Sequence, residues 1–141
     1  MREVTIRRVS VDEAKELIAR EGFIYLDVRD QDEFEEGHAE GAFNVPFLFH
    51  ATGENPNFVR VCERAFGREA KLVVGCKSGV RSLKAATALA ESGFTHIADL
   101  RAGFSGRKSP FGETLEPGWS ATEPIEQSAP DERRYASLET M

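Results

Sequence analysis

Cysteine is scarce in this sequence, with only Cys62 and Cys76 among 141 residues. The two residues do not form a CxxC pair, and they are too few for the disulfide-rich scaffold of a small secreted protein. A chain of this length with 40% hydrophobic residues can bury a core without disulfides or metal. We therefore expect a single folded domain in which any cysteine chemistry is that of a free thiol.

Long apolar runs are also missing. No stretch approaches the roughly 18 consecutive apolar residues of a transmembrane helix. The residues after Met1 are charged, whereas a signal peptide would have an apolar segment there. We therefore expect no membrane partner and a cytoplasmic location.

Basic residues are not in excess, because 18 Lys and Arg stand against 24 Asp and Glu, for a net charge of −6. Binding to a phosphate backbone needs clustered Lys and Arg, so we expect no nucleic-acid partner. Residues 41–100 differ from the rest, with 7 basic and 5 acidic residues. This locally basic middle can attract a small anion.

Short apolar runs alternate with segments of helical periodicity. Strands are predicted at residues 4–8, 23–28, 42–45, 71–75 and 96–100. Helices are predicted from Ser10 to Gly22, Asp30 to Gly37, Asn57 to Phe66 and Ser82 to Ser92. Ser10 with Glu13, and Asp30 with Glu33, have the spacing of capping boxes. The alternation predicts an α/β layer fold with a mainly parallel central sheet.

The last third of the chain loses this periodicity, and glycine and proline become frequent. We predict a main domain over residues 1–110 and an irregular, partly mobile extension over residues 111–141. Phe111 and Trp119 are the candidates to anchor the extension to the body.

Cys76 stands between the predicted strand at 71–75 and the predicted helix that follows, where open parallel sheets bind ligands. Inward-facing backbone N–H groups and the positive end of the helix stabilise a thiolate there. Lys77 and Arg81 add positive charge, and neighbouring cations are known to lower the pKa of a cysteine. Gly79 allows the loop to curl inward. The pattern predicts that Cys76 is a nucleophile.

The segment Gly75-Cys76-Lys77-Ser78-Gly79-Val80-Arg81-Ser82 resembles the active-site loop of the rhodaneses, which are sulfurtransferases. A second set of motifs is similar to the amino-terminal signature of the same family, in its order and spacing. These motifs are Tyr25-Leu26-Asp27-Val28-Arg29, Glu33-Phe34, Gly37-His38 and Gly41-Ala42-Phe43-Asn44-Val45-Pro46. Two separated motifs that agree are more specific than one. The resemblance covers residues 5–105, approximately.

The resemblance implies a rhodanese-like fold, with a central five-stranded, mainly parallel sheet flanked by helices on both faces. It also implies that Cys76 takes sulfur from a small anionic donor such as thiosulfate, and that a thiol or cyanide accepts it from the Cys76 persulfide. No metal or organic cofactor is implied.

The resemblance assigns roles to two groups of residues. The substrate or persulfide cradle comprises Lys77, Ser78, Gly79, Val80, Arg81 and Ser82. The supporting residues are Asp27, Arg29, Glu33 and His38, which we expect to act mainly as scaffold. An ion pair is the simplest role for Asp27 and Arg29, and a hydrogen bond that stabilises a turn is the simplest role for His38.

Several alternatives remain open. The chain could be a sulfur carrier that exchanges persulfide with a protein donor or acceptor and turns over small molecules slowly, or a non-catalytic regulatory module on the same scaffold. Cysteine-dependent phosphatases and some arsenate reductases use similar loops, but with one residue more than the four between Cys76 and Arg81. Cys62 is interpreted as a structural residue, against the alternative of a resolving thiol. Phe47 to Phe49 could line the pocket or enter the core.

Overall fold

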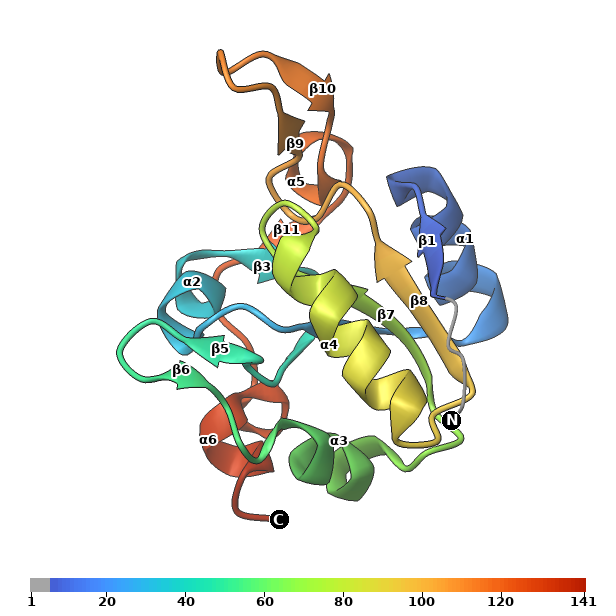
Figure 1. Cartoon of the computed structure of the whole chain (residues 1–141), viewed down its shortest axis with the longest axis vertical. Coiled ribbons are helices and arrows are strands. Elements are labelled where there is room, and N and C mark those ends of the chain that lie inside the picture. Colours follow the sequence, from blue (N-terminus) through green and yellow to red (C-terminus); the bar gives the residue numbers. More distant parts are fainter. Residues whose placement is uncertain (1–5) are drawn as a thin grey trace.

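The computed structural model describes residues 6–141. At its centre is a five-stranded sheet in which every neighbouring pair of strands is parallel (Figure 1). The strand order is β1-β8-β7-β2-β4, with bounds Arg7–Val9, His96–Leu100, Lys71–Gly75, Ile24–Asp27 and Phe43–Asn44. The predicted α/β fold with a mainly parallel sheet is therefore confirmed. Val4 and Thr5 of the first predicted strand lie outside the described residues.

Four longer helices connect these strands. They are α1 (Val11–Glu21), α2 (Gln31–Glu36), α3 (Phe58–Phe66) and α4 (Val80–Glu91). Both predicted capping boxes are present, at Ser10 before α1 and at Asp30 before α2. α4 begins at Val80, two residues before the predicted start at Ser82, and directly follows Gly79, whose left-handed backbone is not helical. Within the described residues, no helix is long and apolar enough to cross a bilayer.

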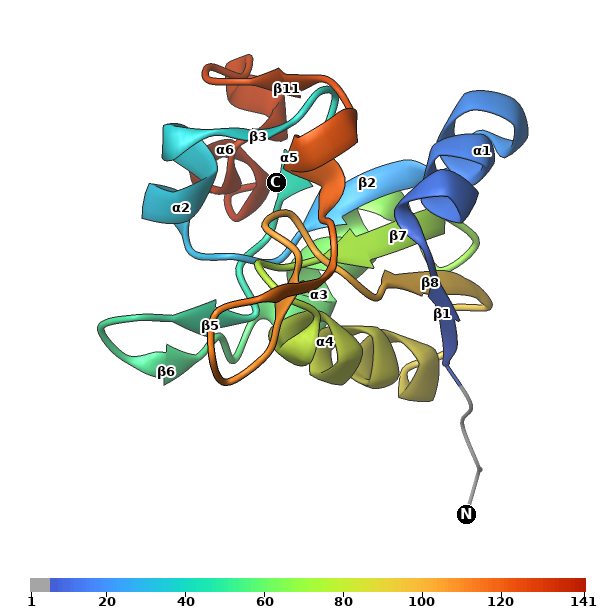
Figure 2. The ribbon, with the colours of Figure 1, turned by 90° about the horizontal axis from the view of Figure 1, so that it is seen from above.

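Helices cover both faces of the sheet. α3 and α4 lie on one face and α1 lies on the other (Figure 2). Side chains along β7 alternate between the two faces, so that Leu72 and Val74 belong to the core under α3 and α4, and Val73 belongs to the core under α1. The predicted helix cover on both faces is thus confirmed, and the carboxyl ends of the strands remain free to form a site.

Several two-residue strands were not predicted. β3 (His38–Ala39) pairs with the C-terminal segment, and β5 (Leu48–Phe49) pairs with β6 (Gly53–Glu54) in a hairpin. Strands this short show no alternation in the sequence, and their existence depends on the partner strand. Phe47, which precedes β5, is buried in the core and packs against Phe58 at 5.3 Å between ring centroids.

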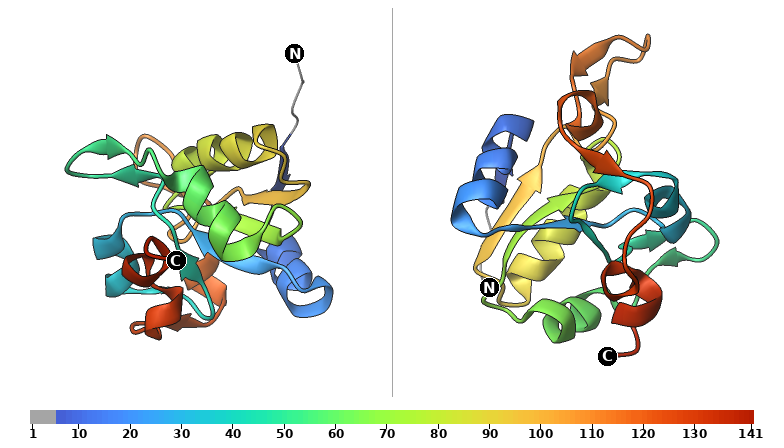
Figure 3. Two further views of the ribbon diagram at one scale, coloured as in Figure 1. Left: turned by 90° about the horizontal axis from the view of Figure 1, so that it is seen from below. Right: turned by 180° about the vertical axis from the view of Figure 1, so that it is seen from behind.

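The predicted irregular segment beyond residue 110 contains regular elements. A hairpin formed by β9 (Arg107–Lys108) and β10 (Thr114–Glu116) projects from one end of the molecule (Figure 1). The chain then runs along the back of the body through further short elements (Figure 3). These are α5 (Trp119–Thr122), β11 (Ile125–Glu126), the 3-10 helix η1 (Asp131–Arg133) and α6 (Tyr135–Leu138).

Buried side chains attach this segment to the body. Trp119 is buried and packs edge-on against Tyr25, with ring centroids 5.2 Å apart, as predicted for an anchor. The other predicted anchor is wrong, because Phe111 is 91% exposed at the hairpin. Tyr135 and Leu138 of α6 enter the same core as α3. Each short element contributes at most two buried residues, which is why periodicity did not reveal them.

Candidate active site

Cys76 lies directly after β7, at the carboxyl end of the sheet. Cys76 is only 1% exposed, yet its sulfur atom has polar hydrogen-bond partners. The N–H of Gly79 donates to Cys76 Sγ at 3.1 Å, and the thiol donates to Ser82 Oγ at 3.4 Å. A serine hydroxyl can also donate once the thiol has lost its proton. The two groups can therefore stabilise a sulfur anion at this position.

The peptide groups of the loop are held by neighbouring segments. The N–H groups of Phe104 and Ser105 donate to the carbonyl oxygens of Cys76 and Lys77, both at 2.8 Å. Arg8 Nη2 donates to the carbonyl oxygen of Gly79 at 3.0 Å. A trans peptide directs its N–H away from its C=O, so the amides of Lys77 and Ser78 face away from residues 104–105. Of the amides expected to face Sγ, the structure brings that of Gly79 within hydrogen-bond distance.

Two glycines make this close packing possible. Gly79 has φ +97°, and a Cβ at this position would overlap the carbonyl oxygen of Arg101. A Cβ on Gly75 would lie 2.7 Å from the hydroxyl oxygen of Tyr25, which is buried beneath the loop. A side chain at Gly79 would therefore displace the loop that carries Cys76, and one at Gly75 would displace that loop or the Tyr25 ring.

Arg81 of the predicted cradle is paired with Glu33 of the predicted support. Arg81 donates to both carboxylate oxygens, at 2.7 and 3.1 Å. Burial favours the neutral form of Glu33, but the hydrogen bond and charge of Arg81 outweigh it and hold the pKa of Glu33 below its usual value. This hydrogen bond also raises the pKa of Arg81, and a charge on Cys76 would act in the same direction. The pair ties α4 to α2 and fixes a positive charge near the thiol.

Two residues near the thiol were missed by the sequence analysis. Asp99 of β8 is fully buried and forms an ion pair of 2.7 Å with Arg8 of β1. Burial raises the pKa of Asp99, and the donors Ser82 and Arg8 offset this only in part. A signal existed in the sequence, since Asp99 is an acidic residue within an otherwise apolar strand end. Its partner is 91 positions away, so the pairing itself was not visible.

Asp27 and Arg29 form the expected ion pair. Arg29 Nη2 lies 2.7 Å from Asp27 Oδ2, and both side chains are buried. Burial disfavours the charge on Arg29, but the Asp27 carboxylate outweighs this and raises the pKa of Arg29. The guanidinium also donates to the carbonyl oxygen of Gly37 at 2.7 Å and lies 4.4 Å above the ring of Phe104. Because the N–H of Phe104 also holds the loop that carries Cys76, the pair braces that loop indirectly.

His38 lies apart from the thiol in a separate cluster. Its ring stacks on Phe34 and its Nδ1 lies 2.7 Å from the carbonyl oxygen of the same residue. Its Nε2 lies 3.1 Å from Glu126 of β11, which also pairs with Arg133 at 2.6 Å. His38 therefore connects the α2 region to the C-terminal segment, in agreement with a role in the scaffold.

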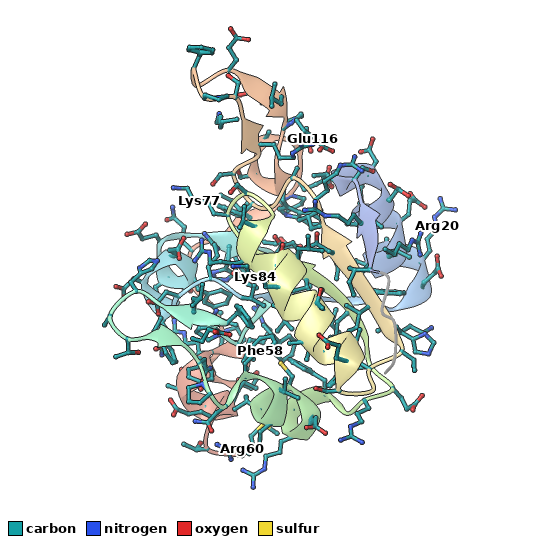
Figure 4. All side chains as sticks on the ribbon, viewed as in Figure 1. Arg20, Phe58, Arg60, Lys77, Lys84 and Glu116 are labelled. Atoms are coloured by element: carbon teal, nitrogen blue, oxygen red, sulfur yellow. The ribbon has the colours of Figure 1, made fainter. Side chains whose placement is uncertain are left out.

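Two clefts border the loop. The larger, of about 610 Å³, is lined by Lys77, Ser78, Val80, Ser105, Gly106, Arg107 and Lys108. The smaller, of about 350 Å³, is lined by Arg29, Glu33, Glu36, Gly37, Lys77, Phe104, Ser105 and Ile125. Both contain Lys77, which is exposed beside the hairpin (Figure 4). Phe47 lines neither cleft. Both clefts therefore border the loop that holds Cys76, although Cys76 itself lines neither.

The other cysteine has a different environment. Cys62 of α3 is fully buried among apolar side chains of the core, and this burial raises the pKa of its thiol well above the usual value. This environment favours the structural interpretation of Cys62. Within residues 6–141, no three His, Cys, Asp or Glu side chains converge as they would around a metal ion.

A family model described as a rhodanese-like domain matches residues 10–109. This chain belongs to the rhodanese-like domain family. It is 45% identical over 100 residues to thiosulfate sulfurtransferase 16, a chloroplastic protein of Arabidopsis thaliana, which covers 69% of this chain and 82% of that relative. The resemblance seen in the loop and signature motifs is therefore confirmed, and the chain is placed with sulfurtransferases at the level of the family.

Further comparisons agree on the fold. Rhodanese-like domain-containing protein 15 of Arabidopsis thaliana, also chloroplastic, is 40% identical over 99 residues, which covers 68% of this chain. The chain spans only 54% of that relative. The crystal structure of Rv0390 from M. tuberculosis superimposes with a TM-score of 0.76 at 24% identity, over 89% of this chain and all of that one. This last likeness supports the fold alone.

Proposed function

We propose that this protein is a sulfurtransferase that carries sulfane sulfur from thiosulfate or a similar donor to a thiophilic acceptor, as a persulfide on Cys76. The observation that carries the proposal is the hydrogen bond from the Gly79 N–H to Cys76 Sγ. It directs a backbone donor at the sulfur, at the start of a long helix whose positive end favours an anion. Membership of the rhodanese-like family and the named relative support the same activity.

The first step forms the persulfide. The Cys76 thiolate attacks the outer sulfur of thiosulfate, a new S–S bond forms, and the electron pair of the old S–S bond leaves with sulfite. The negative charge then moves to the outer sulfur of the persulfide. The positive helix end and Arg81, which is held in place by Glu33, lie where they can stabilise this charge.

The second step discharges the persulfide. A thiolate or cyanide attacks the outer sulfur, and the bond to Cys76 Sγ breaks with its electron pair returning to Cys76. The product is a new persulfide or thiocyanate, and the enzyme regains its thiolate. This two-step exchange needs neither a metal nor an organic cofactor.

Lys77 and Arg81 have different tasks in this proposal. Lys77 is exposed at the rim of both clefts and can attract an anionic donor. Arg81 is engaged by Glu33 and mainly fixes the loop. Because Cys76 is 1% exposed, we expect the exposed side chains of the rim to move aside as the donor enters, on the nanosecond scale of such rotations.

A sulfur-carrier role is the second candidate, and the size of the larger cleft favours it. Its volume of about 610 Å³ exceeds what a single small sulfur anion needs. A carrier would accept or deliver persulfide through a protein and would turn over thiosulfate slowly. Slow turnover together with fast persulfide exchange with a protein thiol would select this role over that of a small-molecule enzyme.

The test of the proposed function is sulfite release from thiosulfate, with cyanide or a thiol as acceptor. We expect Cys76→Ser to reduce turnover to background while the circular dichroism spectrum is unchanged. Cys62→Ser is the matched control, since it also removes a buried thiol but leaves the loop intact, and it should keep most of its turnover. Equal turnover in Cys76→Ser and the native chain would end the proposal.

A further inference from the structure

The larger cleft beside Cys76, here named the basic cleft, has an uneven charge. It is lined by Lys77, Ser78, Val80, Ser105, Gly106, Arg107 and Lys108. Three of these residues are cationic, and within the described part of the chain no acidic side chain is among them. The molecule as a whole carries a net charge of −6. The basic cleft is therefore a local positive site on an acidic protein, and its field favours an acidic ligand.

The hairpin of β9 and β10 forms one wall of this cleft and stands away from the body (Figures 1 and 4). Its base is fixed, because Arg101 donates to both oxygens of Glu116 at 2.9 and 2.7 Å. Lys108 Nζ also donates across the hairpin to Thr114 at 3.0 Å. An isolated two-stranded hairpin is marginally stable, so this anchoring holds it in a defined direction.

Exposed apolar side chains gather around the same place. Residues 6–141 contain five large hydrophobic side chains that are strongly exposed: Val80 at 67%, Phe111 at 91%, Leu115 at 61%, Ile125 at 44% and Met141 at 58%. Val80 lines the basic cleft, Phe111 and Leu115 belong to the hairpin, and Ile125 lines the smaller cleft. Val80 and Ile125 thus border the clefts at the Cys76 loop, and Phe111 and Leu115 lie on the hairpin whose strand β9 lines the basic cleft. Exposed apolar side chains rimmed by polar residues are typical of a surface that another molecule covers.

We propose that the basic cleft and the hairpin dock a protein whose reactive thiol lies in an acidic, partly apolar segment, and that this protein is the acceptor of the Cys76 sulfur. The proposal rests on the proposed sulfurtransferase function. Acidic side chains of the partner pair with Lys77, Arg107 and Lys108, and apolar ones cover Phe111 and Leu115. Transfer breaks the bond between Cys76 Sγ and the outer sulfur and forms a bond from that sulfur to the partner thiolate. The electron pair returns to Cys76, and the partner thiol has lost its proton to solvent beforehand.

Docking is tested first by binding, which does not require sulfur transfer. The probe is a short fluorescent peptide with Glu and Leu on both sides of a central Ser, and the control peptide has Gln at each Glu. We expect saturable anisotropy changes with the acidic peptide that weaken as salt is added. Arg107→Glu/Lys108→Glu should weaken binding by about tenfold or more at low salt. Phe111→Ser/Leu115→Ser should weaken it about equally at low and high salt, because apolar contacts are little screened. Equal binding by the native chain and both variants overturns the proposal.

Transfer is tested second, with Cys in place of the central Ser. The native chain and both variants are loaded with thiosulfate, and discharge to the peptide is compared with discharge to 2-mercaptoethanol and to mercaptosuccinate. We expect the rate of discharge to the peptide to fall about tenfold in each variant. The rate of discharge to 2-mercaptoethanol should stay within about twofold of that of the native chain. The charge reversal could slow discharge to mercaptosuccinate and to the peptide by the same factor, while Phe111→Ser/Leu115→Ser changes neither rate. In that case the cleft is a small-anion site and the proposal is wrong. If the native chain forms no persulfide, the proposed function fails, and the binding result decides the docking proposal alone.

Discussion

The behaviour of single residues in this site depends on which neighbours lie within hydrogen-bond distance. Cys76 and Cys62 are both buried, yet the surroundings of their sulfur atoms differ. Cys76 has a backbone N–H and a serine hydroxyl at its sulfur, while Cys62 lies among apolar side chains that raise the pKa of its thiol. Burial in apolar surroundings makes a cysteine inert, whereas donors directed at the sulfur favour its thiolate, which supports the nucleophilic role proposed for Cys76.

At this scale, Glu33 should show a pH-dependent contribution to stability. Its folded pKa is held below the usual 4.5 by Arg81, although burial acts in the opposite direction. The contribution is therefore present above about pH 4.5 and is lost as the pH falls through the lower folded value. Glu33→Gln keeps the capping hydrogen bond to Asp30 but removes the charge. We expect it to cost about 1–2 kcal/mol of unfolding free energy at pH 7.

Urea unfolding of the native chain and Glu33→Gln across the acid range measures this difference. The stability gap should narrow as the pH falls below about 4.5, since the native carboxylate then takes up a proton. The imidazole of His50 lies 3.1 Å from the Glu33 carboxylate, so His50→Gln should be the common background of both proteins, which removes this ionisable neighbour from the comparison. A gap that stays constant down to low pH would contradict the role of the Arg81 pair.

Gly79 is the residue whose replacement should affect the loop most. An alanine there has an unfavourable positive φ and a Cβ that overlaps the carbonyl oxygen of Arg101. Gly112 is the matched control, since its φ is +84° but a Cβ would meet nothing within 4 Å. We expect Gly112→Ala to cost about 1–2 kcal/mol from backbone strain alone. Gly79→Ala should cost more and should also slow sulfite release by at least about tenfold, because it displaces the donor to Cys76. If Gly79→Ala and Gly112→Ala lower the unfolding free energy and the rate of sulfite release equally, the close packing of Gly79 against Arg101 is unimportant.

At the scale of elements, the C-terminal segment is attached through short pieces that each bury little. β11 pairs with β3, Trp119 packs on Tyr25, and α6 places two side chains in the core under α3. None of these contacts is local in sequence. The segment after residue 110 therefore belongs to the packing of the domain, and it brings Ile125 to the edge of the smaller cleft.

Leu138→Ala tests the attachment of α6. The Leu138 residue is 4% exposed and lies in the same core cluster as Phe58 and Val61 of α3. Deleting its buried methyl groups should lower the unfolding free energy by about 2–4 kcal/mol. Leu115→Ala, at an exposed leucine, should change it by no more than about 0.5 kcal/mol. The measurement is the denaturation midpoint of both variants, and a Leu138→Ala midpoint equal to native would mean that α6 is detached in solution.

The elements that could be predicted from the sequence are those with local signals. Ser10 with Glu13 and Asp30 with Glu33 mark helix starts within four residues of chain, and the buried strands are continuous apolar runs. The loop from Gly75 to Ser82, on which the proposed site depends, is likewise contiguous in sequence. The pairs of Asp99 with Arg8 and of His38 with Glu126 span about 90 positions and were not predictable, because only the folded chain brings them together. The same reason applies to β5, β6 and β11, which exist only through their partners.

At the scale of the whole molecule, an acidic protein presents a basic opening beside a buried thiol. The parallel sheet collects its carboxyl ends at one edge, and Cys76, Asp27 and Asp99 all lie at or near that edge. Open parallel sheets bind ligands at this edge. The scaffold contacts of Arg29, Arg81 and Phe104 hold the Cys76 loop there, so the fold as a whole supports the proposed sulfur site.

Formation of a persulfide on Cys76 can be measured by mass spectrometry of the intact chain after exposure to thiosulfate. We expect a gain of one sulfur atom that maps to the peptide containing Cys76, disappears after cyanide or a thiol is added, and is absent from Cys76→Ser. Cys62→Ser should gain the same mass as the native chain. No gain in mass, or a gain that persists in Cys76→Ser, would show that Cys76 does not carry the sulfur.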